Sequence, residues 1–187
     1  MFTRVLNLKK LSVSQLCAVS MLIAVTAVLS VVSGYLRIGS FGKISISFIS
    51  VYISAAAFGP VIGGLVGALA DIISYFVNPI GAYVWPLTII EYAYGFIFGL
   101  FFFRNTNSKE SISYLKIVFC VVLQFAANMT LKTGVLMSYG YAPSNYAAAF
   151  AMRAPSCLIA AALQLAVISA FEKILPSFMK VLRKKSN

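Results

Sequence analysis

Apolar residues occur in six long runs along the chain, separated by short polar segments. An apolar helix needs roughly 20 residues to cross the hydrocarbon core of a bilayer, which is about 30 Å thick. The pattern therefore predicts six spans within one domain, residues 1–187, and the second span is short. The predicted spans lie near residues 11–33, 44–58, 60–77, 84–103, 115–138 and 146–172.

The composition agrees with this prediction. Hydrophobic residues make up 61 % of the chain and charged residues only 10 %, which is more apolar than a soluble domain of this size. A net charge of +11 also suggests nucleic acid as a partner, but the cations lie at the chain ends and in short connections. We therefore predict an all-α integral membrane protein, a six-helix bundle in contact with the lipid bilayer and not with nucleic acid.

Lysine and arginine residues also predict the orientation, because they are enriched on the cytoplasmic side of membrane proteins. With the N-terminus inside, eleven of the 15 cations lie on the inner side. Both termini are therefore predicted to be cytoplasmic. The inner cations are Arg4, Lys9, Lys10, Arg104, Lys109, Lys116, Lys173, Lys180, Arg183, Lys184 and Lys185.

The four remaining cations lie in the outer half, where topology does not explain them. Arg37 and Lys43 flank a glycine-rich segment, 34–43, that we interpret as a flexible loop and a candidate lid; Lys132 and Arg153 belong to spans five and six. At about 1.5 Å of rise per helical residue, both of these cations lie near the outer face.

Two carboxylates, Asp71 and Glu91, are predicted to lie at membrane depth in the same outer half as these cations, together with Asn128. Glu110 and Glu172 are at the inner side and are expected to be solvated. Charges within a bilayer are costly unless they face partners or water. We therefore predict one polar cavity that opens to the outside.

Aromatic side chains are dense at this level and include Tyr83, Trp85 and Tyr92. A carboxylate beside aromatic rings suits a planar heterocycle with N–H donors, and cations at the mouth suit an anionic tail. Folate, a pterin with a glutamyl dicarboxylate, has both features, although other aromatic anions also do. The chain contains no histidine, which excludes histidine metal sites and Ser–His–Asp triads; we expect no metal and no cofactor.

The segment AFGPVIGGLVGALADIISYF carries Gly59, Gly63 and Gly67 at every fourth position, followed by Asp71. Small residues at this spacing allow another helix to approach closely. Asp71 extends the same stripe outward, so we expect it to support the binding site and not to read the ligand.

These features resemble the substrate-binding S-components of energy-coupling factor (ECF) vitamin transporters, most closely the folate-specific type. The resemblance covers the whole chain. It depends on six spans after a basic N-terminus and on three segments: AAFGPVIGGLVGALADII, NPIGAYVWPLTIIEYAYGFIFGLFF, and TLKTGVLMSYG with AMRAPSCLIAAALQLAVI.

The resemblance implies a binding subunit of the bacterial plasma membrane. Such a subunit captures folate or a related pterin from outside, under the loop between spans one and two. It docks through small residues of span one onto a transmembrane coupling protein with two cytoplasmic ATPases, which alone use ATP. Here Ser20, Ala24 and Ala27 offer such residues. Consistently, the chain has no Walker A sequence.

Three alternatives remain open at this stage. The first is an S-component for another vitamin: thiamin is cationic and is disfavoured by the four outer cations, whereas riboflavin is neutral and needs none of them. The second is a small self-sufficient carrier or channel, although no inverted repeat is visible. The third is a membrane-embedded enzyme, which two separated carboxylates and the lack of histidine disfavour.

Overall fold

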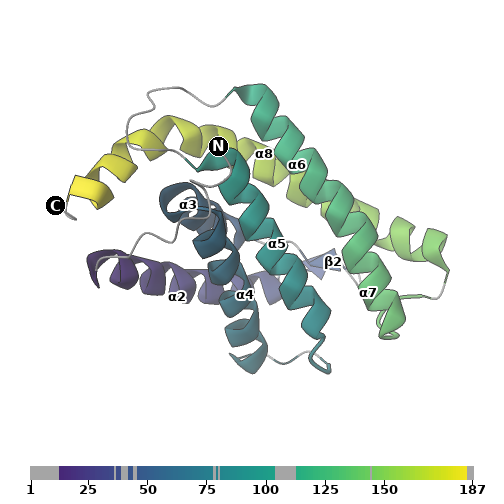
Figure 1. Cartoon of the computed structure of the whole chain (residues 1–187). Helices are drawn as coiled ribbons and strands as arrows, with labels where there is room; N and C mark the ends of the chain where they lie inside the picture. The colour runs from purple at the N-terminus through teal and green to yellow at the C-terminus, as the bar shows by residue number, and fades with distance from the viewer. Residues whose placement is uncertain are drawn as a thin grey trace.

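A computed structural model of the chain describes residues 13–35, 37–38, 42–43, 46–77, 79, 81–103, 113–143 and 145–184. Side chains are described for all of these residues except 37–38, 42–43 and 173–184. Helices lie over all six predicted ranges (Figure 1). They are α2 (Val13–Tyr35), α3 (Phe48–Phe58), α4 (Pro60–Val77), α5 (Trp85–Phe102), α6 (Tyr114–Ala127) continued by the π-helix η1 (Asn128–Lys132) and α7 (Thr133–Ser138), and α8 (Tyr146–Lys184).

Five of these helical segments are long and apolar enough to cross a membrane, and α3 is the exception. Its 11 residues span only about 16 Å. The prediction that this span begins near residue 44 was wrong, because Ile46 and Ser47 precede the helix. The Ile46 backbone N–H donates instead to Ser33 Oγ on α2, at 2.9 Å.

The predicted loop at 34–43 is only partly described. α2 continues to Tyr35, and two short strands, β1 (Arg37–Ile38) and β2 (Gly42–Lys43), form an antiparallel pair. Both strands contact α8. The Arg37 and Lys43 side chains and the rest of this loop lie outside the described residues, so the lid stays a prediction.

Two glycines of α4 bring this helix into close contact with α5. A Cβ added at Gly63 would lie 2.9 Å from the carbonyl oxygen of Gly95, and one added at Gly67 would lie 2.8 Å from that of Glu91. Neither distance leaves room for a side chain, so only glycine permits this approach. Gly59 lies outside this helix contact: with φ at 101° it ends α3 and turns the chain directly into α4, at the boundary predicted between spans two and three.

The core lies where α3, α5, α6 and α8 meet. Tyr52 of α3 is 1 % exposed, and its ring packs edge-on against Phe98 and Phe102 of α5. Its hydroxyl donates to the carboxylate of Glu172 on α8. The expectation that Glu172 is merely solvated was therefore wrong, because this carboxylate accepts the hydroxyl of a buried tyrosine.

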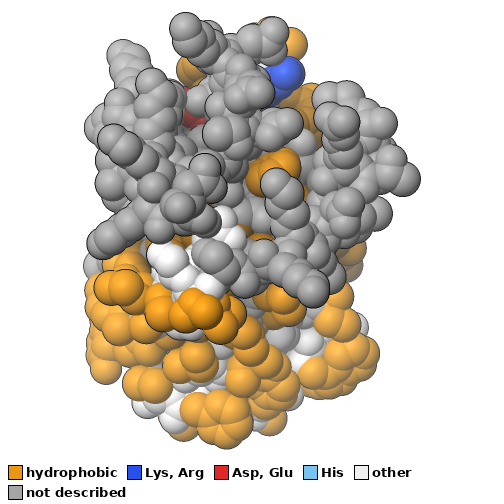
Figure 2. Space-filling model, turned by 60° about the vertical axis from the view of Figure 1, so that its left-hand side comes forward, with side chains coloured by type: hydrophobic (Ala, Val, Ile, Leu, Met, Phe, Trp, Pro, Cys, Tyr) orange, Lys and Arg blue, Asp and Glu red, His pale blue; other side chains and the backbone are white. Residues whose placement is uncertain are grey.

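The outside of the bundle is apolar, as a lipid environment requires. On the face shown in Figure 2, hydrophobic side chains cover most of the described lower half. Large apolar side chains are exposed on every long helix; Met21 of α2, for example, is 71 % exposed and Leu115 of α6 is 79 % exposed. Such surfaces are stable in a bilayer and not in water.

Candidate functional site

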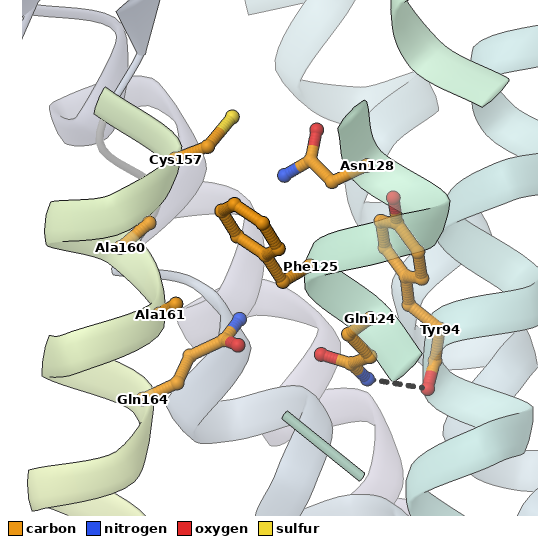
Figure 3. A pocket seen from close by; sticks show the side chains of 8 residues that line it. All are labelled: Tyr94, Gln124, Phe125, Asn128, Cys157, Ala160, Ala161 and Gln164. Carbon is orange, nitrogen blue, oxygen red and sulfur yellow. Dashed lines mark hydrogen bonds between the residues drawn. The ribbon is translucent and has the colours of Figure 1, made fainter. Parts of the chain in front are cut away.

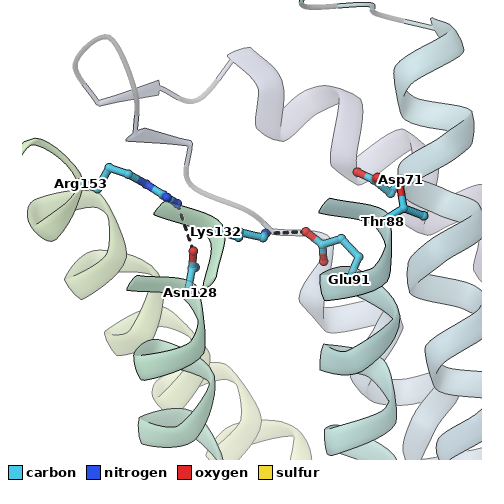
Figure 4. A network of polar contacts seen from close by, with 6 residues as sticks. All are labelled: Asp71, Thr88, Glu91, Asn128, Lys132 and Arg153. Atoms are coloured by element: carbon cyan, nitrogen blue, oxygen red, sulfur yellow. Dashed lines mark hydrogen bonds and ion pairs between the residues drawn. The ribbon is translucent and has the colours of Figure 1, made fainter. Parts of the chain in front are cut away.

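Polar side chains from four helical segments form one row across the bundle (Figure 4). We call this set the polar row. These side chains point toward one another in pairs: Thr88 toward Asp71, Lys132 toward Glu91, and Arg153 toward Asn128. From α4 to α8 the row consists of Asp71, Thr88, Glu91, Lys132, Asn128 and Arg153.

Asp71 anchors the α4 end of the polar row. Its Oδ2 accepts a hydrogen bond from Thr88 Oγ1 at 2.7 Å, and the Tyr83 hydroxyl lies 2.7 Å from the same Thr88 oxygen. Asp71 is one helical turn beyond Gly67, a position where α4 lies close to the α5 backbone. This position agrees with a supporting role, in which Asp71 orients the start of α5.

The centre of the polar row is an ion pair. Lys132 Nζ donates to Glu91 Oε1 at 2.6 Å, and the two side chains are 19 % and 31 % exposed, respectively. The ammonium group also lies 5.1 Å from the centre of the Tyr94 ring, a favourable cation–π distance. Two residues predicted to bind ligand therefore pair with each other.

Arg153 forms the α8 end of the polar row and is held by neutral groups. Its Nη1 donates to Thr133 Oγ1 at 2.9 Å and its Nη2 donates to Asn128 Oδ1 at 3.1 Å. The side chain is only 7 % exposed, and its Nε has no hydrogen-bond partner among the described residues. In the part of the chain that the structure describes, no carboxylate pairs with this guanidinium.

A small, partly open hollow lies between α5, α6 and α8 (Figure 3). Asn128 belongs both to this hollow and to the polar row, whereas the three charged residues 91, 132 and 153 do not line the hollow. Its wall also carries the Tyr94 hydroxyl, which forms a hydrogen bond with none of the residues that the structure describes. The lining residues are Tyr94, Gln124, Phe125, Asn128, Cys157, Ala160, Ala161 and Gln164.

Other predicted site residues lie apart from the polar row. Trp85 begins α5 and is 59 % exposed. Tyr92 faces α4, where its ring fills the space beside Gly64, and it stacks on Phe96. The side chain of Arg37 is outside the described residues.

Sequence reasoning missed three polar residues that hold the site together. Thr88 is three positions before Glu91 and thus on the same helical face, a spacing that could have indicated it. Gln124 is 4 % exposed and donates to the backbone oxygen of Tyr94 at 3.3 Å. No sequence pattern indicated Thr133, because the orientation of its side chain depends on the π-helix.

The residues predicted to dock a partner divide into two groups. Ser20 and Ala24 are exposed on α2. Ala27 is only 5 % exposed, and its backbone oxygen accepts a hydrogen bond from Ser74 of α4. Including Ala27 in the docking surface was wrong, because it faces the bundle interior.

The described residues offer no obvious metal site, since no three of their Cys, Asp and Glu side chains cluster. Of the two acids in the polar row, Asp71 accepts a hydrogen bond from Thr88 and Glu91 pairs with Lys132. The polar row therefore offers hydrogen bonds and charge to a ligand.

Comparison with known proteins places these features in one family. The model of the family described as “ECF-type riboflavin transporter, S component” matches residues 10–175. The folate transporter FolT of Clostridium novyi (strain NT) is 33 % identical over 112 residues, which cover 59 % of this chain and 59 % of that protein. The crystal structure of FolT bound with folic acid has a similar fold, with a TM-score of 0.71 and 22 % identity, over 88 % of this chain and 98 % of that one.

Proposed function

Since this chain belongs to the S-component family of ECF-type transporters, we propose that it is a folate-binding S-component that delivers the vitamin to partner subunits. It is a multi-pass membrane protein, and its family consists of transporter subunits and not of enzymes. The folate transporter from Clostridium novyi supports folate as the ligand, over the 59 % of each chain that aligns.

The polar row is the observation that carries this proposal. Folate has a pterin ring with adjacent N–H and amino donors at one end and two carboxylates at the other. Glu91 offers an acceptor for such donors, and Lys132 and Arg153 offer charge-assisted hydrogen bonds to carboxylates. These side chains come from three helices that are far apart in sequence and lie on one line (Figure 4).

Riboflavin is the second candidate, because the description of the matching family names it. Its ring system and ribityl chain are neutral. A neutral ligand would leave the buried guanidinium of Arg153 without an anion, which is unfavourable at membrane depth. The charge of the site therefore favours folate.

Transport requires partners in this proposal. The chain contains no Walker A sequence, so ATP would be used only by two cytoplasmic ATPases joined to a transmembrane coupling protein. The exposed residues Ser20 and Ala24 on α2 would contact that coupling protein. The chain itself would capture folate from outside, with both of its termini in the cytoplasm.

Fluorescence of the single tryptophan tests the ligand. The chain is purified alone in detergent, and Trp85 emission is followed while folate, riboflavin or thiamin is added without ATP. Saturable quenching by folate at the lowest concentration supports the proposal. Saturable quenching by riboflavin with no response to folate would identify riboflavin as the ligand. Uptake of another solute by the chain alone in vesicles would indicate a self-sufficient carrier.

A further inference from the structure

The two cations of the polar row differ in what balances their charge. Lys132 is paired with Glu91 at 2.6 Å. Arg153 is more deeply buried, at 7 % exposure, and its partners Asn128 and Thr133 are both neutral. Because a buried charge is costly without a counter-charge, Arg153 is the group in this row that most needs an anion.

The π-helix explains how one helix can hold Arg153 in this way. Asn128 and Thr133 are five positions apart, and in an α-helix they would point about 140° apart. A π-helix pairs residue i with residue i+5 and brings these two positions onto one side. Both side chains therefore reach the same guanidinium.

The same turn directs Lys132 toward Glu91 of α5 (Figure 4). The Glu91 carboxylate therefore pairs with Lys132 and not with Arg153. Within the part of the chain that the structure describes, Arg153 also retains an unused donor, since its Nε has no hydrogen-bond partner there. A fixed, buried guanidinium with a free N–H and no carboxylate partner in the described chain is an anion site.

We propose that Arg153 is the carboxylate anchor of this S-component, with Asn128 and Thr133 as positioning residues presented by the π-helix η1. Lys132 neutralises Glu91 and is not the main anion receptor. This inference deepens the proposed function and rests on it, because the carboxylates in question are those of the glutamyl tail of folate.

The test compares folate with its diamide, in which both glutamyl carboxylates are converted to neutral amides. The readout is the ratio of the two dissociation constants, amide over acid, for the purified full chain. A charge-assisted hydrogen bond contributes a ratio of roughly 10 to 100, and we expect such a ratio for the unmodified chain. Arg153→Gln should lower the ratio to about 1, and Arg153→Lys should retain part of it. The double variant Glu91→Gln with Lys132→Gln removes one charge of each sign. It should weaken the binding of both ligands and leave the ratio unchanged.

Positioning is tested by Thr133→Val, which removes one hydrogen bond and should lower the ratio by roughly 3- to 10-fold. Thr133→Ser should restore it. The matched control is Thr130→Val in the same π-helix, because the Thr130 side chain is exposed and bonds only to its own helix, at Ala126; its ratio should not change. If Arg153→Gln does not fold, the Thr133 variants still test whether Arg153 binds a folate carboxylate.

The outcomes separate the two proposals. If the unmodified chain binds no folate, the proposed function fails. If it binds folate but the ratio is near 1, or the ratio survives Arg153→Gln and collapses in the Glu91/Lys132 pair variant, folate binding stands and the anchor assignment is overturned.

Discussion

Replacing Gly67 by alanine probes how helix packing sets the binding site. The new Cβ would lie 2.8 Å from the backbone oxygen of Glu91. An ordinary van der Waals contact begins at 3.4 Å, so α5 must move away by about 0.6 Å at the residue that pairs with Lys132. Overpacking of this kind costs roughly 1–3 kcal/mol, against which the better helix propensity of alanine recovers up to about 1 kcal/mol.

The assay has two readouts on the purified chain, thermal unfolding and folate affinity. At roughly 2–4 °C per kcal/mol for a chain of this size, Gly67→Ala should lower the unfolding temperature by several degrees. It should also weaken folate, because Glu91 is displaced from Lys132. The matched control is Gly134→Ala in α7, where the nearest atom is the Tyr146 hydroxyl at 3.2 Å, the flexible end of an exposed side chain. If Gly67→Ala unfolds and binds like the unmodified chain, the close approach of α4 and α5 does not position Glu91.

Three further changes test other parts of the structure. Glu91→Gln should weaken folate affinity by roughly 10- to 100-fold. In the double variant with Lys132→Gln, the loss of binding free energy should be smaller than the sum of the two single losses, because the two residues share one ion pair. Additive losses in this double-mutant cycle would contradict the pairing. Tyr52→Phe should destabilise the fold by roughly 1–2 kcal/mol in thermal unfolding with unchanged folate affinity, and a loss of affinity at unchanged stability would argue against a structural role. Ser20→Trp should abolish folate uptake with the partner subunits but leave folate binding by the isolated chain intact. Ala27→Trp should instead impair folding, measured as the yield of folded protein. The opposite results would place Ser20 in the interior and Ala27 on the surface.

Much of the architecture could be predicted because membrane spans can be identified from long apolar runs in the sequence. Every backbone group in a bilayer must be hydrogen-bonded within a helix, so each long apolar run became one. The break at Gly59 and Pro60 was also predictable, since glycine allows a positive φ and proline favours the first turn of a helix.

Details that depend on tertiary contacts could not be predicted. The length of α3 depends on the hydrogen bond between Ile46 and Ser33, and the burial of Ala27 depends on how α4 packs against α2. The sequence indicated charges in one half of the membrane but not their pairing. The π-helix at Asn128–Lys132 has no composition signal of its own, yet it determines which side chain reaches Arg153.

A structure of the purified chain determined with folate tests the central claim most directly, namely that the polar row is the folate site. The account predicts folate between α5, η1 and α8, with a glutamyl carboxylate on the Arg153 guanidinium and the pterin donors on Glu91. Folate bound at another surface, with Glu91 still paired only to Lys132 and no anion at Arg153, would contradict it.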